Sequence, residues 1–292
     1  MFYNRNNYMK KIFPLLIIFI IFIIFTPIIS HADMGPKPSV VIDFSGLEEQ
    51  KYFVTLLSEK SSNGPYSVFT DEYPGYYQES DPNYDIFLKF TEFKDDYYFI
   101  QFFHECTDIN TFNWTYYPPE KFKILIYLPE KDEFILSEIY EKYAFDSYFT
   151  ANIENMSFTG INKSYDYFNE YFALVSRILI TILIELLILF LFRFKEKKQI
   201  IFIIIINIAT QILLNILLNN ILYSSGKMAF DFYYILFEII ITIIEMTAYS
   251  IYFKKCSKNP YPLWKPPVYA LTANIASFIA GFGIAFILPN IF

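Results

Sequence analysis

Four long apolar segments occupy the C-terminal part of the chain, over residues 173–192, 199–222, 232–253 and 268–288. Each segment is close to the length of about 20 residues that an α-helix needs to cross the hydrocarbon core of a bilayer. Short, more polar stretches separate the segments. The pattern predicts an all-α bundle of four transmembrane helices, with the lipid bilayer as its surroundings.

Each segment also carries a side chain that hydrocarbon disfavours, and all four lie at nearly the same depth. Counted from the segment ends next to the connections 193–198 and 254–267, they lie six to eight residues inside: Glu185, Asn207, Glu245 and Asn274. A charged Asp at mid-helix costs about 2.5–3.5 kcal/mol on the insertion scale. We therefore expect the helices to pack with these side chains inward, as a polar layer that is a candidate proton or cation site.

A second polar level lies nearer the opposite ends of the helices and contains Arg177, Asn215 and Glu238. Arg177 could reach Glu238 or Asp231, whereas Glu185 and Glu245 have no basic residue at their own depth. If these two carboxyl groups approach each other, at least one is expected to be neutral and to donate a hydrogen bond. The alternative is that a cation or a substrate amine supplies the missing positive charge.

Residues 1–32 have the pattern of a secretory signal peptide. Three basic residues precede an apolar stretch over 12–25, and Ser30-His31-Ala32 has small residues at the -3 and -1 positions of a cleavage site. The alternative is an uncleaved anchor over 12–29, which is marginally long for a membrane span and contains two prolines.

The distribution of basic residues predicts how the chain crosses the membrane. The connections 193–198 and 254–267 each carry four Lys or Arg residues, and the positive-inside rule places such connections in the cytoplasm. Residues 33–172 and the C-terminus are then extracytoplasmic, which agrees with a secretory signal. The sequence therefore predicts a multi-pass protein of the cell membrane.

Residues 33–172 show the patterns of a mostly-β domain. The β-rich runs at 39–44 and 52–57 suggest a hairpin, and further strands are expected at 97–103, 122–128, 133–138 and 147–153. Residues 84–93 place Ile86, Phe87, Phe90 and Phe93 on one side at helical spacing. We predict a sandwich-like extracytoplasmic domain with one short helix, joined to the four-helix transmembrane domain at 173–292.

Charge differs sharply between the two parts. Residues 33–172 contain 25 Asp or Glu against 10 Lys, a net charge of -15, whereas residues 173–292 contain 5 acids against 10 bases, a net charge of +5. Nucleic-acid binding requires a basic footprint, which the predicted soluble domain lacks. An acidic exported domain instead suits cations or basic partners.

The motifs of common enzyme classes are absent from the sequence. There is no H-E-x-x-H zinc motif, no serine hydrolase signature and no Gly-rich phosphate loop, so we predict a non-enzymatic protein without cofactor or metal. Cys106 and Cys256 are predicted on opposite sides of the membrane, which excludes a disulfide between them. Cys106 is interpreted as a buried thiol, with an intermolecular disulfide or a lipid or metal contact as the alternatives.

Several stretches resemble an uncharacterised family of Gram-positive bacterial membrane proteins. They are ADMGPKPS at 32–39, YYPP at 116–119 and YAFDSYF at 143–149, together with the helices that carry Glu and Asn. The resemblance spans nearly the whole chain after residue 32. It implies the same architecture, an exported N-terminal β-rich domain followed by four transmembrane helices, and it implies no activity and no catalytic residue.

Two hypotheses for function follow. In the first, the exported domain binds an envelope protein or wall component, and the helices anchor it or sense its state. In the second, the protein is a transporter or transport accessory in which Glu185 and Glu245 bind a proton, a cation or an amine substrate. Four helices are few for a complete carrier, so the second hypothesis would require a homo-oligomer or a partner.

Overall fold

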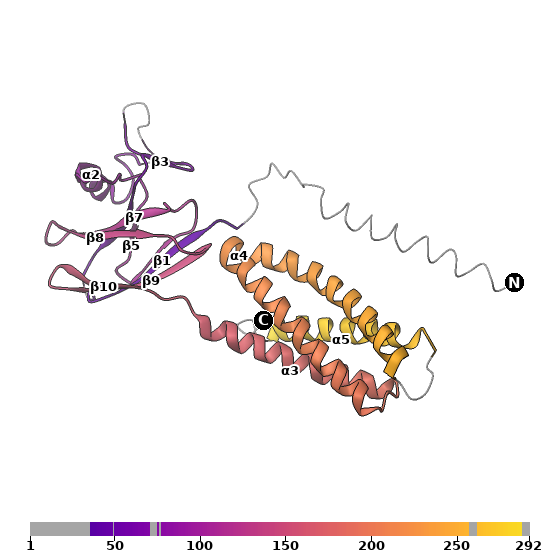
Figure 1. Ribbon diagram of the computed structural model, residues 1–292. Helices are drawn as coiled ribbons and strands as arrows, with labels where there is room; N and C mark the ends of the chain where they lie inside the picture. The colour runs from indigo at the N-terminus through magenta and orange to yellow at the C-terminus, as the bar shows by residue number, and fades with distance from the viewer. Residues whose placement is uncertain (1–35, 49, 71–74, 76, 257–261, 288–292) are drawn as a thin grey trace. The chain divides into compact units, whose positions relative to one another are not determined.

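The structure is a computed structural model that describes residues 36–48, 50–70, 75, 77–256 and 262–287. Within these ranges a β-rich part comes first in the chain and a helical part follows it (Figure 1). The signal peptide predicted at 1–32 lies outside the described residues, as does its cleavage site. The described strands and helices therefore confirm the predicted order of a β-rich part before a helical part.

The strands described in the β-rich part form two four-stranded sheets and one two-stranded sheet. The first sheet has the order β10-β9-β1-β6, with strands Ser157–Lys163, Asp146–Glu154, Ser39–Ser45 and Thr111–Trp114. The second has the order β5-β2-β7-β8, with strands His104–Glu105, Phe53–Ser58, Lys121–Leu128 and Glu133–Glu141. The small sheet pairs β3, Ser62–Asn63, with β4, Tyr66–Ser67.

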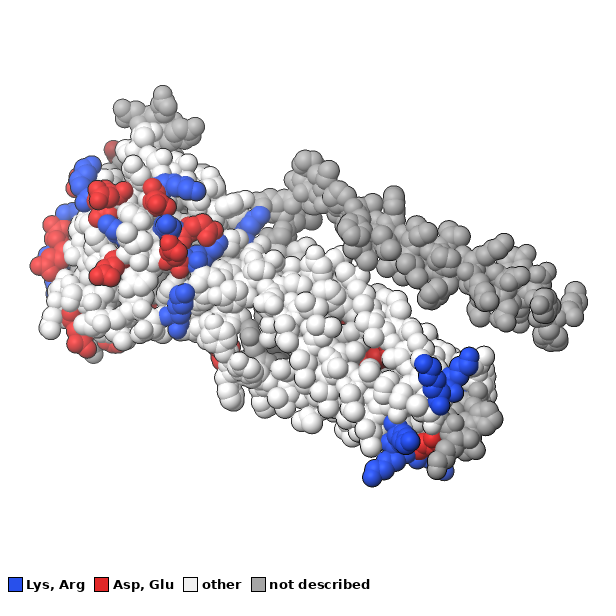
Figure 2. Space-filling view, in the orientation of Figure 1, with Lys and Arg blue, Asp and Glu red and all other residues white. Residues whose placement is uncertain are grey.

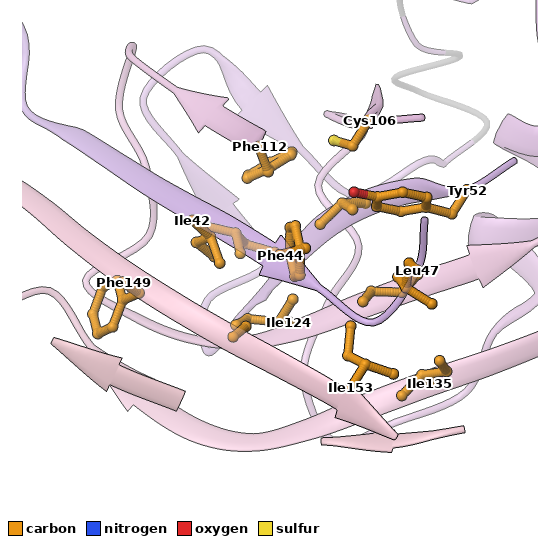
Figure 3. Packing of buried hydrophobic residues seen from close by; sticks show 14 of the residues in the cluster. Ile42, Phe44, Leu47, Tyr52, Cys106, Phe112, Ile124, Ile135, Phe149 and Ile153 are labelled. Carbon is orange, nitrogen blue, oxygen red and sulfur yellow. The ribbon is translucent and has the colours of Figure 1, made fainter. Parts of the chain in front are cut away.

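The two larger sheets share one hydrophobic core, as in a sandwich (Figure 3). Ile42 and Phe44 of β1 and Phe149 of β9 come from the first sheet, and they pack in the same cluster as Leu56 and Ile124 of the second. Alternate residues of β1 and of β7 supply this cluster, because successive side chains point to opposite faces of a sheet.

A second apolar cluster covers the other face of the second sheet. Helix α2, Tyr84–Glu92, buries Phe87 and Phe90 in a cluster with Phe53 and Leu57 of β2. All six residues of β2 are buried as a result, since each of its faces has an apolar layer on it. The structure confirms the predicted short amphipathic helix and explains why β2 has apolar residues on both of its faces.

The predicted hairpin between the first two strands is wrong. β1 pairs in parallel with β9 and antiparallel with β6, whereas β2 pairs antiparallel with β7 and β5. Each strand turns one apolar face to the shared core, where the two faces meet instead of forming one continuous surface. A hairpin and two facing sheets would both bury the apolar side chains of these strands. The apolar pattern alone therefore does not predict which strand pairs with which.

Two other expectations for the β-rich part also differ from the structure. Residues 97–103 form only a single bridge between Tyr98 and Ser58, while Phe99 and Phe103 pack in the cluster beneath α2. Strands β6 and β10 occur where no strand was expected.

The helical part consists of α3, Tyr167–Leu191, α4, Lys197–Cys256, and α5, Lys265–Ile287. Two of the described helices, α3 at Leu174–Leu191 and α4, are long and apolar enough to cross a membrane by length and composition. Helices were expected at 199–222 and 232–253 with a loop between them. Instead α4 is helical throughout except at Gly226, where φ is 78° and ψ is -180°.

Gly226 lets α4 fold back on itself (Figure 1). A positive φ of this kind favours glycine, because a Cβ atom would clash with the backbone. We call residues 197–225 the first arm and residues 227–256 the second arm. Ile203 of the first arm and Tyr249 of the second arm pack in one cluster with Leu189 of α3 and Ala273 of α5. The two arms therefore take the places of two of the expected helices.

Replacing Phe87 with Ala tests the role of α2 in the second core. Phe87 is fully buried, so its loss should lower the free energy of unfolding by about 3–5 kcal/mol. Its neighbour Leu88 is 38% exposed, and Leu88→Ala should cost about 0.5 kcal/mol or less. Urea unfolding of the full chain, followed by the fluorescence of buried Trp114 in a W264F background, measures both. Equal losses would contradict the assignment of α2 as the cover of the second sheet.

Candidate functional site

The structure brings the four residues of the predicted polar layer into the interior of the helical part. Glu185 lies on α3, Asn207 on the first arm of α4, Glu245 on the second arm and Asn274 on α5. Their exposed fractions are 0, 1, 1 and 5%, respectively. Because water does not reach these side chains, their polar atoms need hydrogen bonds from one another, or a bound proton or ion.

The four residues form two carboxyl–amide pairs. Asn207 donates from Nδ2 to Oε2 of Glu185, and Asn274 donates from Nδ2 to Oε2 of Glu245 over 2.7 Å. Each pair joins two different helical segments. In the described structure no hydrogen bond links the two carboxyl groups directly, so the amides separate the carboxyls into two local sites.

Two hydroxyl groups connect these pairs into a closed ring. Thr210 of the first arm donates from Oγ1 to Oε1 of Glu245 over 2.9 Å. The hydroxyl of Tyr269 on α5 lies 3.3 Å from the carbonyl oxygen of Glu185 and 3.4 Å from its Oε2. Side-chain hydrogen bonds now run from α3 to the first arm, from the first arm to the second, from the second arm to α5, and back to α3. We call these residues the polar ring: Glu185, Asn207, Thr210, Glu245, Tyr269 and Asn274.

Three groups in or beside the ring were not among the candidate site residues. Tyr249 lies four residues after Glu245, and this helical spacing places it on the same inward-facing stripe. Thr210 lies three residues after Asn207, so helical spacing could have indicated it too. Asn207 donates to the Tyr249 hydroxyl over 3.0 Å. Tyr269 precedes Asn274 by five residues, which is no helical repeat, and only the packing of α5 against α3 brings it to the ring.

Two oxygens of the ring have no hydrogen-bond donor in the described structure. They are Oε1 of Glu185 and Oδ1 of Asn207, and both are buried. Buried polar atoms in proteins almost always have a hydrogen-bond partner. Each of these two oxygens therefore requires an explanation, such as a bound proton, water or ion. At Glu245, by contrast, both carboxyl oxygens accept a hydrogen bond.

Of the second level predicted from the sequence, Arg177 and Asn215 are buried in the helical part and Glu238 is half-buried. Arg177 donates from Nη1 to Oδ1 of Asn215 over 3.2 Å, and its guanidinium lies 5.5 Å from the ring centre of Phe230 and 5.7 Å from that of Tyr234. Such cation–π contacts strengthen when they are shielded from water. Asp231, which the sequence suggests as another partner of Arg177, instead forms an exposed ion pair with Lys227.

Two cavities adjoin Glu238. A small one of about 10 Å³, room for one water at most, is bordered by Glu238 together with Arg177, Thr181 and Gln211. A larger groove of about 330 Å³ lies between the second arm and α5 and is mainly apolar, with Glu238 and Asn274 among its lining. Glu238 is therefore the carboxyl group shared by both spaces.

The described residues contain no cluster of three or more side chains that could hold a metal ion. In the β-rich part His104 is exposed and stacks on Phe102, with ring centres 4.9 Å apart. Cys106 is 1% exposed, which confirms its interpretation as a buried thiol, and Cys256 is a free, exposed cysteine. Burial raises the pKa of the Cys106 thiol to about 12.

Comparisons with known proteins add no functional residue. No protein-family model matches the chain, and neither a curated protein nor a solved structure matches it. The resemblance to Gram-positive membrane proteins remains a prediction, and the candidate site is interpreted from its own geometry.

Replacing Asn274 with Ala tests the ring. The change removes the donor to Oε2 of Glu245 and leaves a buried oxygen without a partner, which should lower stability by about 1–3 kcal/mol. Thr272→Ala is the matched control on α5, because Thr272 is exposed and its hydroxyl donates to the carbonyl of Val268 on its own helix. Unfolding of the full chain in detergent micelles measures both variants. A loss no greater than that of the control would show that the ring does not hold α5.

Proposed function

We propose that the chain is a multi-pass protein of the cell membrane. In this proposal α3, the two arms of α4 and α5 cross the bilayer, residues 33–172 and the C-terminus are extracytoplasmic, and the connections 193–198 and 254–267 are cytoplasmic. The outer surface of the helices supports it. Leu179, Leu183 and Leu187 on α3 are 58–63% exposed, whereas the polar ring is buried.

This distribution is the reverse of that in a water-soluble helix bundle, where polar side chains face outward. On the face shown in Figure 2 the helical part is mostly white along its length, and Lys and Arg gather at one end. Exposed aliphatic side chains suit contact with lipid, and a cationic end suits the cytoplasmic leaflet.

We further propose that the protein is non-enzymatic and that its helices anchor, or sense the state of, an exported domain that binds an envelope protein or wall component. The closed polar ring is the observation that carries this proposal. Helices in lipid have no hydrophobic drive to associate, so packing and hydrogen bonds between them supply much of the attraction. A ring that links all four segments gives the intramembrane carboxyls and amides a structural role.

A second candidate function is transport, or assistance to a transporter, with a proton, cation or amine bound in the helical part. It is favoured by the two ring oxygens without a donor and by the cavities beside Glu238. Because four helices are few for a carrier, this function would require a homo-oligomer or another membrane protein.

Flux measurements separate the two functions. The full chain is reconstituted in vesicles that contain a pH-sensitive dye, and gradients of protons, sodium ions or methylammonium are imposed. An anchor should give no flux above that of protein-free vesicles, and the double variant E185Q/E245Q should behave identically. Flux in the wild type that disappears in this variant would overturn the anchor function and support transport.

Cysteine labelling tests the proposed crossing of the membrane. A membrane-impermeant maleimide added to intact cells should label E138C in a C256S background, because Glu138 is exposed on the extracytoplasmic domain. Wild-type Cys256 should react only after the cells are permeabilised. Cys106 should stay unlabelled at pH 8 in both cases, since its pKa of about 12 keeps the buried thiol protonated. Labelling of Cys256 in intact cells would contradict the proposed topology.

A further inference from the structure

The two carboxyl groups of the polar ring have unequal surroundings. Glu245 accepts a hydrogen bond at each oxygen, from Thr210 and from Asn274. Glu185 accepts at Oε2 only, and its Oε1 has no donor. A carboxylate is a pure acceptor at both oxygens, whereas a carboxylic acid has one oxygen that must donate. The surroundings of Glu245 therefore suit a carboxylate and those of Glu185 suit an acid.

Asn207, the partner of Glu185, also has one oxygen without a hydrogen bond. Asn207 donates from Nδ2 to Glu185, and its own Oδ1 has no donor. A carboxylic acid and a primary amide can form a cyclic pair through two hydrogen bonds, in which the amide N–H donates to the acid and the acid O–H donates to the amide oxygen. The bond from the amide N–H to Oε2 of Glu185 is present. A proton on Oε1 of Glu185, donated to Oδ1 of Asn207, would form the second bond and give both unpartnered oxygens a partner.

We propose that Glu185 and Asn207 form a proton-binding site, in which a proton on Oε1 of Glu185 is donated to Oδ1 of Asn207, while Glu245 in the same ring is ionised. The proposal depends only on the packing of the four helical segments. It holds whether the protein is an anchor or part of a transporter.

A proton fits this site better than a metal ion. The groups that face the two carboxyls are mainly donors, namely the amide nitrogens of Asn207 and Asn274 and the hydroxyls of Thr210 and Tyr269. Donor hydrogens repel a cation. Among the described atoms of the ring, two buried oxygens have no hydrogen bond, whereas Ca²⁺ takes six to eight oxygen ligands and Mg²⁺ takes six.

The charges around Glu185 favour the same assignment. Asn207 and Tyr249 face the ring from the two arms of α4 and Tyr269 faces it from α5, all as neutral groups, while Glu245 is the other acidic group of the ring. On α3 itself Arg177 lies eight residues away, about 12 Å along a helix, and bonds to Asn215. Two buried negative charges without a nearby base are costly, so one carboxyl should hold a proton.

Infrared difference spectroscopy tests the proposal on the full chain in lipid at neutral pH. The C=O stretch of a carboxylic acid is separate from the bands of a carboxylate. Subtracting the spectrum of E185Q from that of the wild type should reveal the loss of an acid band. Subtracting that of E245Q, the matched control, should reveal the loss of carboxylate bands. Loss of the acid band in E245Q alone, or the absence of any acid band, would overturn the proposal.

Two further measurements cover the case in which E185Q does not fold. Asn207→Ala removes the amide oxygen that accepts the proton, so the acid band should move to the frequency of a more weakly hydrogen-bonded acid. An unmoved band would overturn the pairing. Sodium or calcium ions should leave the Tm of the wild type unchanged relative to choline, and a rise in Tm that N207A abolishes would identify a metal site instead.

Discussion

The helical part depends on one constraint, which is that its buried polar groups must find their partners among themselves. The exposed large side chains of α3 and of both arms of α4 are aliphatic or aromatic, so polar atoms placed among them would meet hydrocarbon if the protein spans a bilayer. The polar ring links all four segments with side-chain hydrogen bonds, and the proton proposed on Glu185 would partner the two oxygens that these bonds leave without a donor. The ring residues lie far apart in the sequence, and their polar atoms are paired only when the four segments pack in this order. The hydrogen bonds therefore favour this one arrangement of the bundle.

In the β-rich part, by contrast, the burial of apolar side chains determines which sheets and helix pack together. Its second sheet is covered on one side by the first sheet and on the other by α2, and its two central strands, β2 and β7, are apolar on both faces. Such a central sheet resists changes of register, because a shift by one residue would exchange two sets of side chains that differ in size.

The depth of the polar residues was predictable, and their pairing was not. Counting along a helix gives the height of Glu185 or Asn274 to within a turn, because the rise per residue is constant. Which carboxyl meets which amide depends on how the segments are ordered around the bundle, and this order is a tertiary property. The same limit explains the wrong hairpin, since β1 and β2 have the right pattern for strands but choose partners far away in the chain.

The fold-back at Gly226 restricts insertions and deletions in the two arms of α4. Asn207 and Glu245 lie at equal distances along the sequence before and after this glycine, so the fold-back places both at the same level. An insertion or deletion of one residue in either arm would turn the rest of that arm by about 100° and shift it by about 1.5 Å. Natural variants should therefore keep the length of each arm while their aliphatic residues exchange freely, so the spacing around this glycine is a stricter marker of relatives than residue identity.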